Sequence, residues 1–293
     1  HVKSVAKMIA ARSLSISITE TAIKLGEVNI DNGKYDCNAK SYPINNWASA
    51  DNVITQWKNA IDDFCKDDQQ KFSVLMIAMP GPFDYEKGIS YIKENRNLKS
   101  LYGVNIKDDL AKILDITSSQ IIFYNDAVCA LAADLSLSLV GENVLGLYFN
   151  EGFGSALYQN GKIIDAELWN KAYLNGTSED FFSIKWLRKN YFKRTGLNIV
   201  DVNEMNDFSL STIKELYKIF TDHLANYIKI LAQDFQIQSI VLGGETLAGP
   251  IDIFPLLVKK LRNLNVKVEI VKSQLSTNAA LIGTKVLCSK MQR

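Results

Sequence analysis

Alternating and helical spacings of apolar residues divide the chain into two similar halves. From Ser13, apolar and polar positions alternate as in strands, with a turn at 31–33 where an Asp-Asn-Gly run interrupts the pattern. A helical spacing follows from about Asp51 to Cys65, then a buried apolar strand, a short helix near 108–114 and a strand at 121–124. The first half therefore predicts a three-stranded meander followed by helices and parallel strands.

The second half repeats this order of elements. An apolar strand, a glycine-containing corner, a second strand, an Asn-Gly turn and a third strand occupy 143–149, 150–154, 155–159, 160–161 and 162–168. Long helices then lead to strands near 237–244 and 266–271. The repetition indicates an internally duplicated α/β fold, with two lobes facing each other across a central cleft.

The domain boundaries follow from this duplication. We expect an N-terminal lobe at 13–119, a C-terminal lobe at 120–276, and a closing helix at 277–293 that packs back on the N-terminal lobe. Residues 1–12 have the spacing of a short amphipathic helix and receive no function. Phosphate-binding loops would lie at the first corner between strands in each half.

Composition limits the classes of partner. The 293 residues contain 33 Lys and Arg against 32 Asp and Glu, and this formal net charge of +1 gives no electrostatic footprint for nucleic acid or for an anionic membrane. No apolar run is long enough to span a bilayer, and no signal-peptide core is present. We therefore expect a cytoplasmic protein with a small-molecule partner.

Cysteine and histidine contribute little chemistry. The four cysteines lie far apart without a Cys-x-x-Cys pair, which argues against a zinc knuckle or a disulfide framework. The histidines are His1 and His223, too few for a site of clustered imidazoles and a poor basis for a Ser-His-Asp triad. We expect His223 on the surface or flank of a long helix. The chemistry must then rest on carboxylates, amides and backbone.

Asp126 is the first candidate for a catalytic group. A short apolar strand delivers an Asn-Asp-Ala corner into a small-residue helix, and a carboxylate at such a strand end can take a proton from a substrate hydroxyl. Asn125 and Asp126 are also residue types that cap helices, because their side chains accept hydrogen bonds from free backbone N–H groups. Both interpretations stay open at this point.

Four segments in this order resemble the ROK family of sugar kinases, in the actin and hexokinase superfamily: IAMPGPFDYEKGIS, IIFYNDAVCALAAD, NEGFGSALYQNGKIIDAELWN and IVLGGETLAGP. The resemblance covers nearly the whole chain from about Ser13. It implies an actin-like, ribonuclease H-like ATPase fold and a hexokinase or glucokinase-like phosphotransferase that uses ATP and Mg²⁺. It also implies a small-molecule sugar as substrate and a homodimer.

The resemblance also assigns residues to the sugar site. Asp126 matches the aspartate that deprotonates the attacking sugar hydroxyl, and Asn125 matches the sugar-binding amide. Gly81 lies in a segment similar to the loop that covers the sugar, where a glycine allows close backbone approach. Asn97 begins a stretch similar to one whose leading asparagine touches the sugar, and Glu167 corresponds to the glutamate that accepts hydrogen bonds from sugar hydroxyls.

The phosphate loops depart from the family pattern. The family has an acid followed by Gly-Gly-Thr in the first loop and Gly-Thr-Gly in the second, whereas this chain has polar or acidic residues at most of these positions. The cofactor-binding positions are then Ser17, Thr19, Glu20 and Thr21 in the first loop, Glu151, Gly152 and Gly154 in the second, and Gly243 and Gly244 on the adenosine side. A glutamate facing a phosphate about 4 Å away would cost roughly 4 kcal/mol at an effective dielectric of about 20.

The tract from Trp169 to Gly196 lacks the histidine and cysteine cluster that binds zinc in many ROK proteins, so we expect no zinc. Two functions remain open. The first is a hexose kinase with Asp126 as general base and MgATP as donor. The second is a sugar-binding or sensing protein of the same fold that has lost productive ATP binding. The sequence does not specify which sugar binds.

Overall fold

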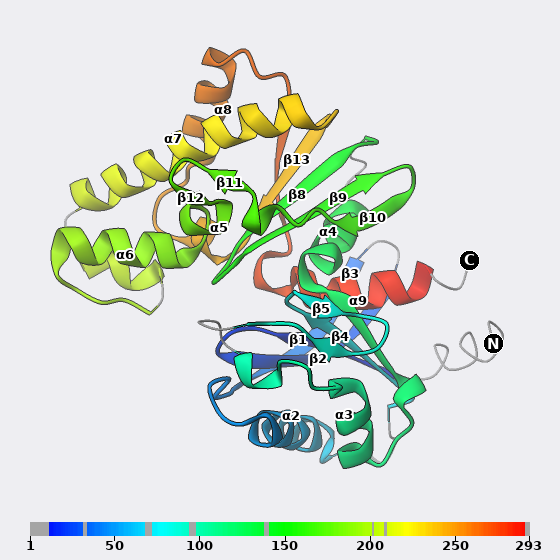
Figure 1. Cartoon of the computed structure of the whole chain (residues 1–293). Coiled ribbons are helices and arrows are strands. Elements are labelled where there is room, and N and C mark those ends of the chain that lie inside the picture. The colour runs from blue at the N-terminus through cyan, green and yellow to red at the C-terminus, as the bar shows by residue number, and fades with distance from the viewer. Residues whose placement is uncertain are drawn as a thin grey trace. The chain divides into compact units, whose positions relative to one another are not determined.

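The computed structural model describes residues 12–31, 34–67, 72–93, 98–137, 141–200, 202–207 and 210–290 (Figure 1). These residues form two units, each with its own five-stranded sheet. The first unit comprises the described residues up to Leu137 and those from Asn278 onward, and the second lies between them in the chain. The turn residues 32 and 33, Asn97 and the unassigned N-terminal segment, except for Arg12, lie outside the described residues.

The first sheet has the strand order β3-β2-β1-β4-β7. Strands β1, β2 and β3 form an antiparallel meander, and β4 and β7 continue the sheet in parallel with β1. The strands are β1 (Ser13–Ile18), β2 (Ala22–Asp31), β3 (Lys34–Pro43), β4 (Val74–Met79) and β7 (Ile121–Asn125). Because β1, β4 and β7 are parallel, their carboxyl ends meet at one edge of this sheet.

Alternation along β1 decides which helices cover each face. Its apolar residues belong to the core shared with α2 (Ala50–Cys65) and α3 (Ile106–Leu114), which lie together in Figure 1. Its serines face α9 (Ala279–Lys290), where the Thr284 hydroxyl donates to Ser15 Oγ at 2.8 Å and Lys285 Nζ donates to Ser13 Oγ at 2.7 Å. A strand with buried hydroxyls on one face is therefore stabilised by a polar helix surface.

Helix α9 also packs against α4 (Asp126–Leu137). A Cβ added to Gly283 would lie 1.8 Å from the Cys129 carbonyl oxygen, so the two helix backbones approach as closely as a glycine permits. Strand β7 lies in the first sheet and α4 packs on α9. For this reason the first unit runs to Leu137, whereas the sequence placed the boundary after Ser119.

The second sheet repeats the plan of the first, with the order β10-β9-β8-β13-β14. Three strands form an antiparallel meander and two continue the sheet in parallel with β8. They are β8 (Val144–Phe149), β9 (Phe153–Gln159), β10 (Lys162–Asp165), β13 (Ser239–Gly243) and β14 (Glu269–Lys272). The prediction of an internally duplicated α/β fold is confirmed by these two matching sheets.

The core of the second unit joins β8 and β13 to the long helix α7 (Leu210–Asp234), with α6 (Ile184–Thr195) and α8 (Phe254–Asn263) beside it. His223 of α7 is half-buried against the rings of Tyr173, Phe181 and Trp186, on the flank of this long helix. Aromatic packing from a neighbouring segment covers this side of the helix. Among the described residues, no helix combines the length and apolar character needed to cross a membrane.

Candidate functional site

The edge where β4 and β7 end brings together the side chains of Asn125 and Tyr85 and the backbone of Gly81. Met79 pairs with Asn125 across the two strands, and the loop after β4 contains Gly81. Asn125 Nδ2 donates to the Tyr85 hydroxyl at 3.0 Å, and that hydroxyl donates to the Met79 carbonyl at 3.1 Å. A Cβ added to Gly81 would lie 3.2 Å from the Tyr85 hydroxyl. The predicted residues Gly81 and Asn125 therefore lie together, joined by Tyr85.

Asn125 also caps helix α4. Its Oδ1 accepts the Val128 N–H at 3.0 Å, while Asp126 Oδ1 accepts the N–H of its neighbour Ala127 at 2.8 Å. The capping interpretation is thus correct for Asn125, which is buried at 8 % exposure. The cap fixes the direction of the amide group, and a fixed amide can distinguish one hydroxyl arrangement from another. Asp126 follows at the first position of the helix and is partly buried.

The corner between β1 and β2 forms a closed turn. The Thr19 N–H donates to the Ala22 carbonyl at 2.9 Å, and the Ala22 N–H donates to Thr19 Oγ1 at 3.1 Å. Asn46, at 1 % exposure, donates through Nδ2 to the carbonyls of Thr19 and Glu20 at 2.7 and 2.9 Å. The corner is therefore fixed by side chains, where the family pattern has glycines.

A protein-held magnesium ion does not fit this corner. Ser17 occupies the position of the acid in the family pattern, is 6 % exposed and pairs across the strands with Lys24. A neutral hydroxyl is a weak ligand for Mg²⁺, which prefers carboxylates and phosphates. Among the described residues, no three His, Cys, Asp or Glu side chains are grouped so that they could hold a metal ion.

The corresponding edge of the second unit joins two of the predicted nucleotide segments. Asn150 follows β8, and its Oδ1 accepts the Glu245 N–H at 3.0 Å, although the two residues are 95 positions apart. Its carbonyl accepts the Ile184 N–H at 2.8 Å. Gly244 has φ 102° and ψ 166°, a region that essentially only glycine adopts, and an added Cβ would lie 2.5 Å from Phe149 N. The loop after β13 therefore lies directly against the end of β8.

The remaining residues of the second loop are held by charged groups. Glu151 pairs with Arg188 of α6 at 2.5 Å between Oε1 and Nη1, and Glu179 Oε2 accepts the Phe153 N–H at 3.3 Å. A Cβ added to Gly152 would lie 3.1 Å from the Glu179 carboxylate. The predicted carboxylate at Glu151 is therefore paired with a cation, which the sequence did not reveal.

Two of the predicted glycines lie in strands. Gly154 is the second residue of β9 and pairs with Tyr148, and Gly243 ends β13 and pairs with Tyr148 on its other side. A Cβ added to Gly243 would lie 2.9 Å from the Tyr148 ring. Gly243 therefore leaves room for the Tyr148 ring at the strand ends.

Glu167 lies on a tight turn after β10. Its φ is 49°, its N–H donates to Asp165 Oδ1 at 2.8 Å, and the next N–H, of Leu168, donates to the buried Ser155 hydroxyl at 3.0 Å. Burial raises the pKa of the Asp165 carboxyl, the hydrogen bond from Glu167 opposes this, and the charge of Glu167 adds to it. The Glu167 side chain is exposed, so it is accessible to a ligand.

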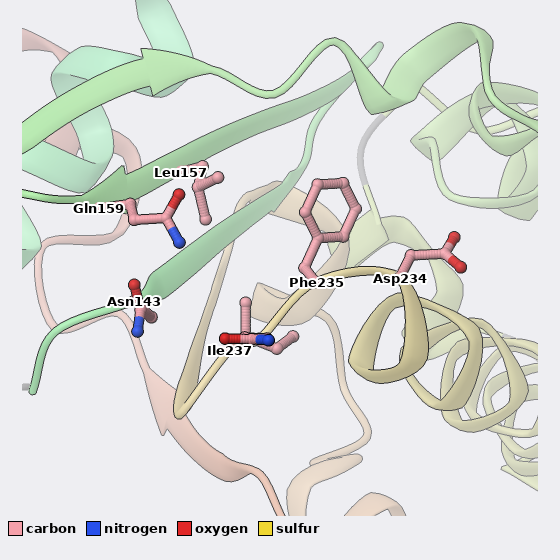
Figure 2. Close-up of a pocket in the computed structure, with 7 residues that line it drawn as sticks. Asn143, Leu157, Gln159, Asp234, Phe235 and Ile237 are labelled. Atoms are coloured by element: carbon pink, nitrogen blue, oxygen red, sulfur yellow. The ribbon is translucent and has the colours of Figure 1, made fainter.

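A pocket of about 210 Å³ occurs elsewhere in the second unit (Figure 2). Its lining includes Asn143, Gln159 and Ile237, which lie at the amino ends of β8 and β13 and at the end of β9. Asn150 and Gly244 follow the carboxyl ends of the same two parallel strands. A six-residue strand spans about 20 Å, so this pocket is separate from the candidate nucleotide loops.

Sequence reasoning missed three residues that shape these loops: Tyr85, Asn46 and Arg188. Tyr85 stands inside the quoted segment IAMPGPFDYEKGIS, so its phenol was available as a signal. Asn46 and Arg188 lie outside the quoted segments and reach the loops only through the folding of the chain.

Comparison with known proteins gives a family and a fold. The sequence profile of the ROK family matches residues 21–167. Among curated proteins, none has a significant sequence match to this chain.

Many solved structures have the same fold. The inorganic polyphosphate/ATP-glucomannokinase from Arthrobacter sp. strain KM is 21% identical, with 96% of this chain and 99% of that chain covered and a TM-score of 0.70. A ROK family glucokinase from Streptomyces griseus, in complex with glucose and AMPPNP, is 14% identical, with 95% and 99% covered and a TM-score of 0.75.

A transcriptional regulator has this fold as well. The ROK family regulator homologous to the E. coli MLC protein is 15% identical, with 96% of this chain and 78% of that chain covered and a TM-score of 0.70. At such low identities the likeness establishes the fold, and the activity has to be argued from the site.

Proposed function

Because the chain belongs to the ROK family, we propose that it is a sugar kinase that transfers the γ-phosphoryl group of ATP to a hexose hydroxyl. Asp126 acts as general base, Asn125 and Gly81 bind the sugar, and Glu167 accepts hydrogen bonds from sugar hydroxyls. Asp126 takes the proton of the attacking hydroxyl as the new O–P bond forms. The bond from the γ-phosphorus to the bridging oxygen breaks and ADP leaves.

One observation carries this proposal. Asp126 follows directly after Asn125, whose amide is fixed by the Tyr85 hydroxyl on one side and by the Val128 N–H on the other. A carboxylate beside an amide of fixed direction can meet one hydroxyl of a bound sugar while the amide binds its neighbour. The nearby Gly81 leaves no side chain in the way of the ligand.

The residues predicted to bind ATP support the kinase proposal in part. The Gly243-Gly244 segment lies against the end of β8, and in this proposal the adenosine of ATP lies along this segment. Ser17 stands at the position of the family's acid and has no carboxylate for Mg²⁺, so in this proposal the ion arrives bound to the phosphates of ATP. Ser17, Thr19 and Thr21 then offer the donor backbone and hydroxyl groups of a closed turn, and Glu20 stands among them.

Sugar phosphorylation tests the proposal. The protein is incubated with MgATP and a panel of hexoses and N-acetylhexosamines, and sugar phosphate is measured by mass spectrometry. We expect one sugar to be phosphorylated and Asp126→Asn to lower kcat by a hundredfold or more, in line with the ~10²–10⁴ contribution of general base catalysis. Asp109→Asn, an exposed carboxylate in the first turn of α3, is the matched control. Equal activity of the Asp126 variant and the wild type would rule out the assigned base.

A second candidate function is a sugar-binding protein without phosphoryl transfer. The turn at Thr19, closed by Ala22 and Asn46, favours it because that corner lacks the glycine backbone that wraps a phosphate. Calorimetry with the same sugars and, separately, with MgATP distinguishes the two functions. Sugar binding without ATP binding supports the second candidate, and any turnover excludes it. Light scattering of the same samples tests the homodimer that the family suggests.

A further inference from the structure

The Glu151–Arg188 ion pair at the corner between β8 and β9 has geometry that suggests a role beyond packing. Arg188 Nη1 lies 2.5 Å from Glu151 Oε1, and the two side chains are 27% and 16% exposed. Arg188 Nη2 donates to the Val200 carbonyl, which holds the guanidinium by its second terminal nitrogen. The Nε atom is buried and has no hydrogen-bond partner among the described residues. The arginine is thus held in place at the corner.

The charge of this corner depends on Arg188. Glu151 occupies the middle of the Asn-Glu-Gly run that follows β8, and Glu179 places a second carboxylate beside Gly152 and the Phe153 N–H. Without the guanidinium, Glu151 would lose the cation that pairs with it at this corner. One uncompensated carboxylate about 4 Å from a phosphate weakens binding by up to roughly a thousandfold at an effective dielectric of about 20.

We propose that Arg188 determines whether the β8–β9 corner accepts the phosphates of a nucleoside triphosphate, because it neutralises Glu151. This inference rests on the proposed function only in its assignment of the corner to the donor phosphates. Arg188 acts through Glu151 and is therefore a positioning residue. Its effect should appear with ligands that carry a phosphate chain and be absent with ligands that end at the α-phosphate.

A double-mutant cycle on the full chain tests this role. The variants are Arg188→Gln, Glu151→Gln, the double variant and the conservative Arg188→Lys, and calorimetry without sugar measures binding of ATP, tripolyphosphate and AMP. We expect Arg188→Gln to weaken ATP and tripolyphosphate at least tenfold and AMP less than twofold. When Glu151 is also replaced, loss of Arg188 should cost less than threefold. Arg188→Lys should stay within about threefold of the wild type, because the positive charge is kept.

A purely structural ion pair gives a different pattern. It would weaken ATP and AMP equally, or leave ATP binding unchanged, and either result overturns the inference. Thermal unfolding of each variant shows whether it is folded, because removing one partner of a part-buried pair also destabilises the protein. If Arg188→Gln is unfolded, the ATP affinities of Glu151→Gln, the double variant and Arg188→Lys are compared instead. Affinities within about threefold of one another support the inference, and a larger loss in the double variant overturns it.

The outcome is separable from that of the kinase test. If the wild type and the variants show the expected differences in ATP affinity but no sugar is phosphorylated, the role of Arg188 is supported and the proposed kinase function is excluded. If sugar is phosphorylated and the KM for ATP is the same in the wild type and in Arg188→Gln, the kinase function is supported and the inference about Arg188 is overturned. If neither the wild type nor Glu151→Gln binds ATP or tripolyphosphate, the corner is no phosphate site and the inference is overturned.

Discussion

The side-chain amide of Asn125 donates a hydrogen bond of 3.0 Å to the hydroxyl of Tyr85. Because that hydroxyl also donates to the Met79 carbonyl, one phenol fixes an amide at the end of β7 and the backbone at the end of β4. The relationship places the strand end, the loop after β4 and the start of α4 in a defined arrangement.

Removal of the Tyr85 hydroxyl should weaken sugar binding, because it leaves the Asn125 amide less firmly held. In Tyr85→Phe, Asn125 loses an acceptor worth about 1 kcal/mol, so we expect roughly fivefold weaker binding of the sugar. Titration calorimetry measures the affinity. Tyr102→Phe is the control, since Tyr102 is 50% exposed in the same unit and should leave the affinity unchanged. An equal loss in both variants would contradict the assigned role of Tyr85.

Gly244→Ala should strongly destabilise the second unit. An added Cβ would lie 2.5 Å from Phe149 N, and the backbone conformation is one that other residues rarely adopt. We expect a loss of about 3 kcal/mol or more in the free energy of unfolding, and lost ATP binding. Gly161→Ala is the matched control, because its φ is also positive at 75° but nothing lies within 4 Å of an added Cβ. Its loss should stay near 1 kcal/mol.

The stability of the fold should decrease on acidification because of His223. Burial lowers the pKa of this histidine from its ordinary value of 6.5, and the charge of Asp222 opposes part of the shift. The unfolded chain therefore binds the proton at a higher pH than the folded chain. Stability begins to fall as the pH drops through about 6.5 and levels off once the pH lies below the folded pKa. Melting temperatures across this range measure the loss, and His223→Gln should remove the step. If His223→Gln shows the same fall in melting temperature with pH as the wild type, the fall comes from other titratable groups.

Gly283→Ala should separate helices α4 and α9. The added Cβ would lie 1.8 Å from the Cys129 carbonyl oxygen, an overlap that costs about 3 kcal/mol. Alanine is the better helix former by about 1 kcal/mol, so the net loss should be about 2 kcal/mol. Urea unfolding checks this value. A variant as stable as the wild type would show that the helices have room to adjust.

The sequence predicts the sheets well because their signals are local. The alternation in β1 and the apolar run in β8 each mark a buried strand, and the Asn160-Gly161 turn marks the hairpin between β9 and β10. The order of the strands within each sheet was not part of the prediction and is seen only in the structure. Short-range patterns alone do not determine which strands are neighbours.

The site was predicted less completely because its contacts are long-range. The resemblance brought out Asn125 and Asp126, but the use of Asn125 as a helix cap and as a donor to Tyr85 depends on two neighbouring elements. The Glu151–Arg188 pair depends on α6 lying beside the β8–β9 corner. Side-chain directions at such corners are set by tertiary packing, so the identity of a residue did not show whether its charge was paired.

Helix α9 packs on the first unit but follows the second unit in the chain, so the first unit is completed only after the second has been synthesised. The second unit is continuous in the chain, whereas β1 and β4 of the first unit pack against α9, which begins only at Ala279. At about 5–20 residues per second, translation of the intervening unit keeps that face of the first sheet uncovered on the ribosome for roughly 10 to 30 seconds. The nascent first unit therefore keeps the serine face of β1 without its helical cover until α9 emerges.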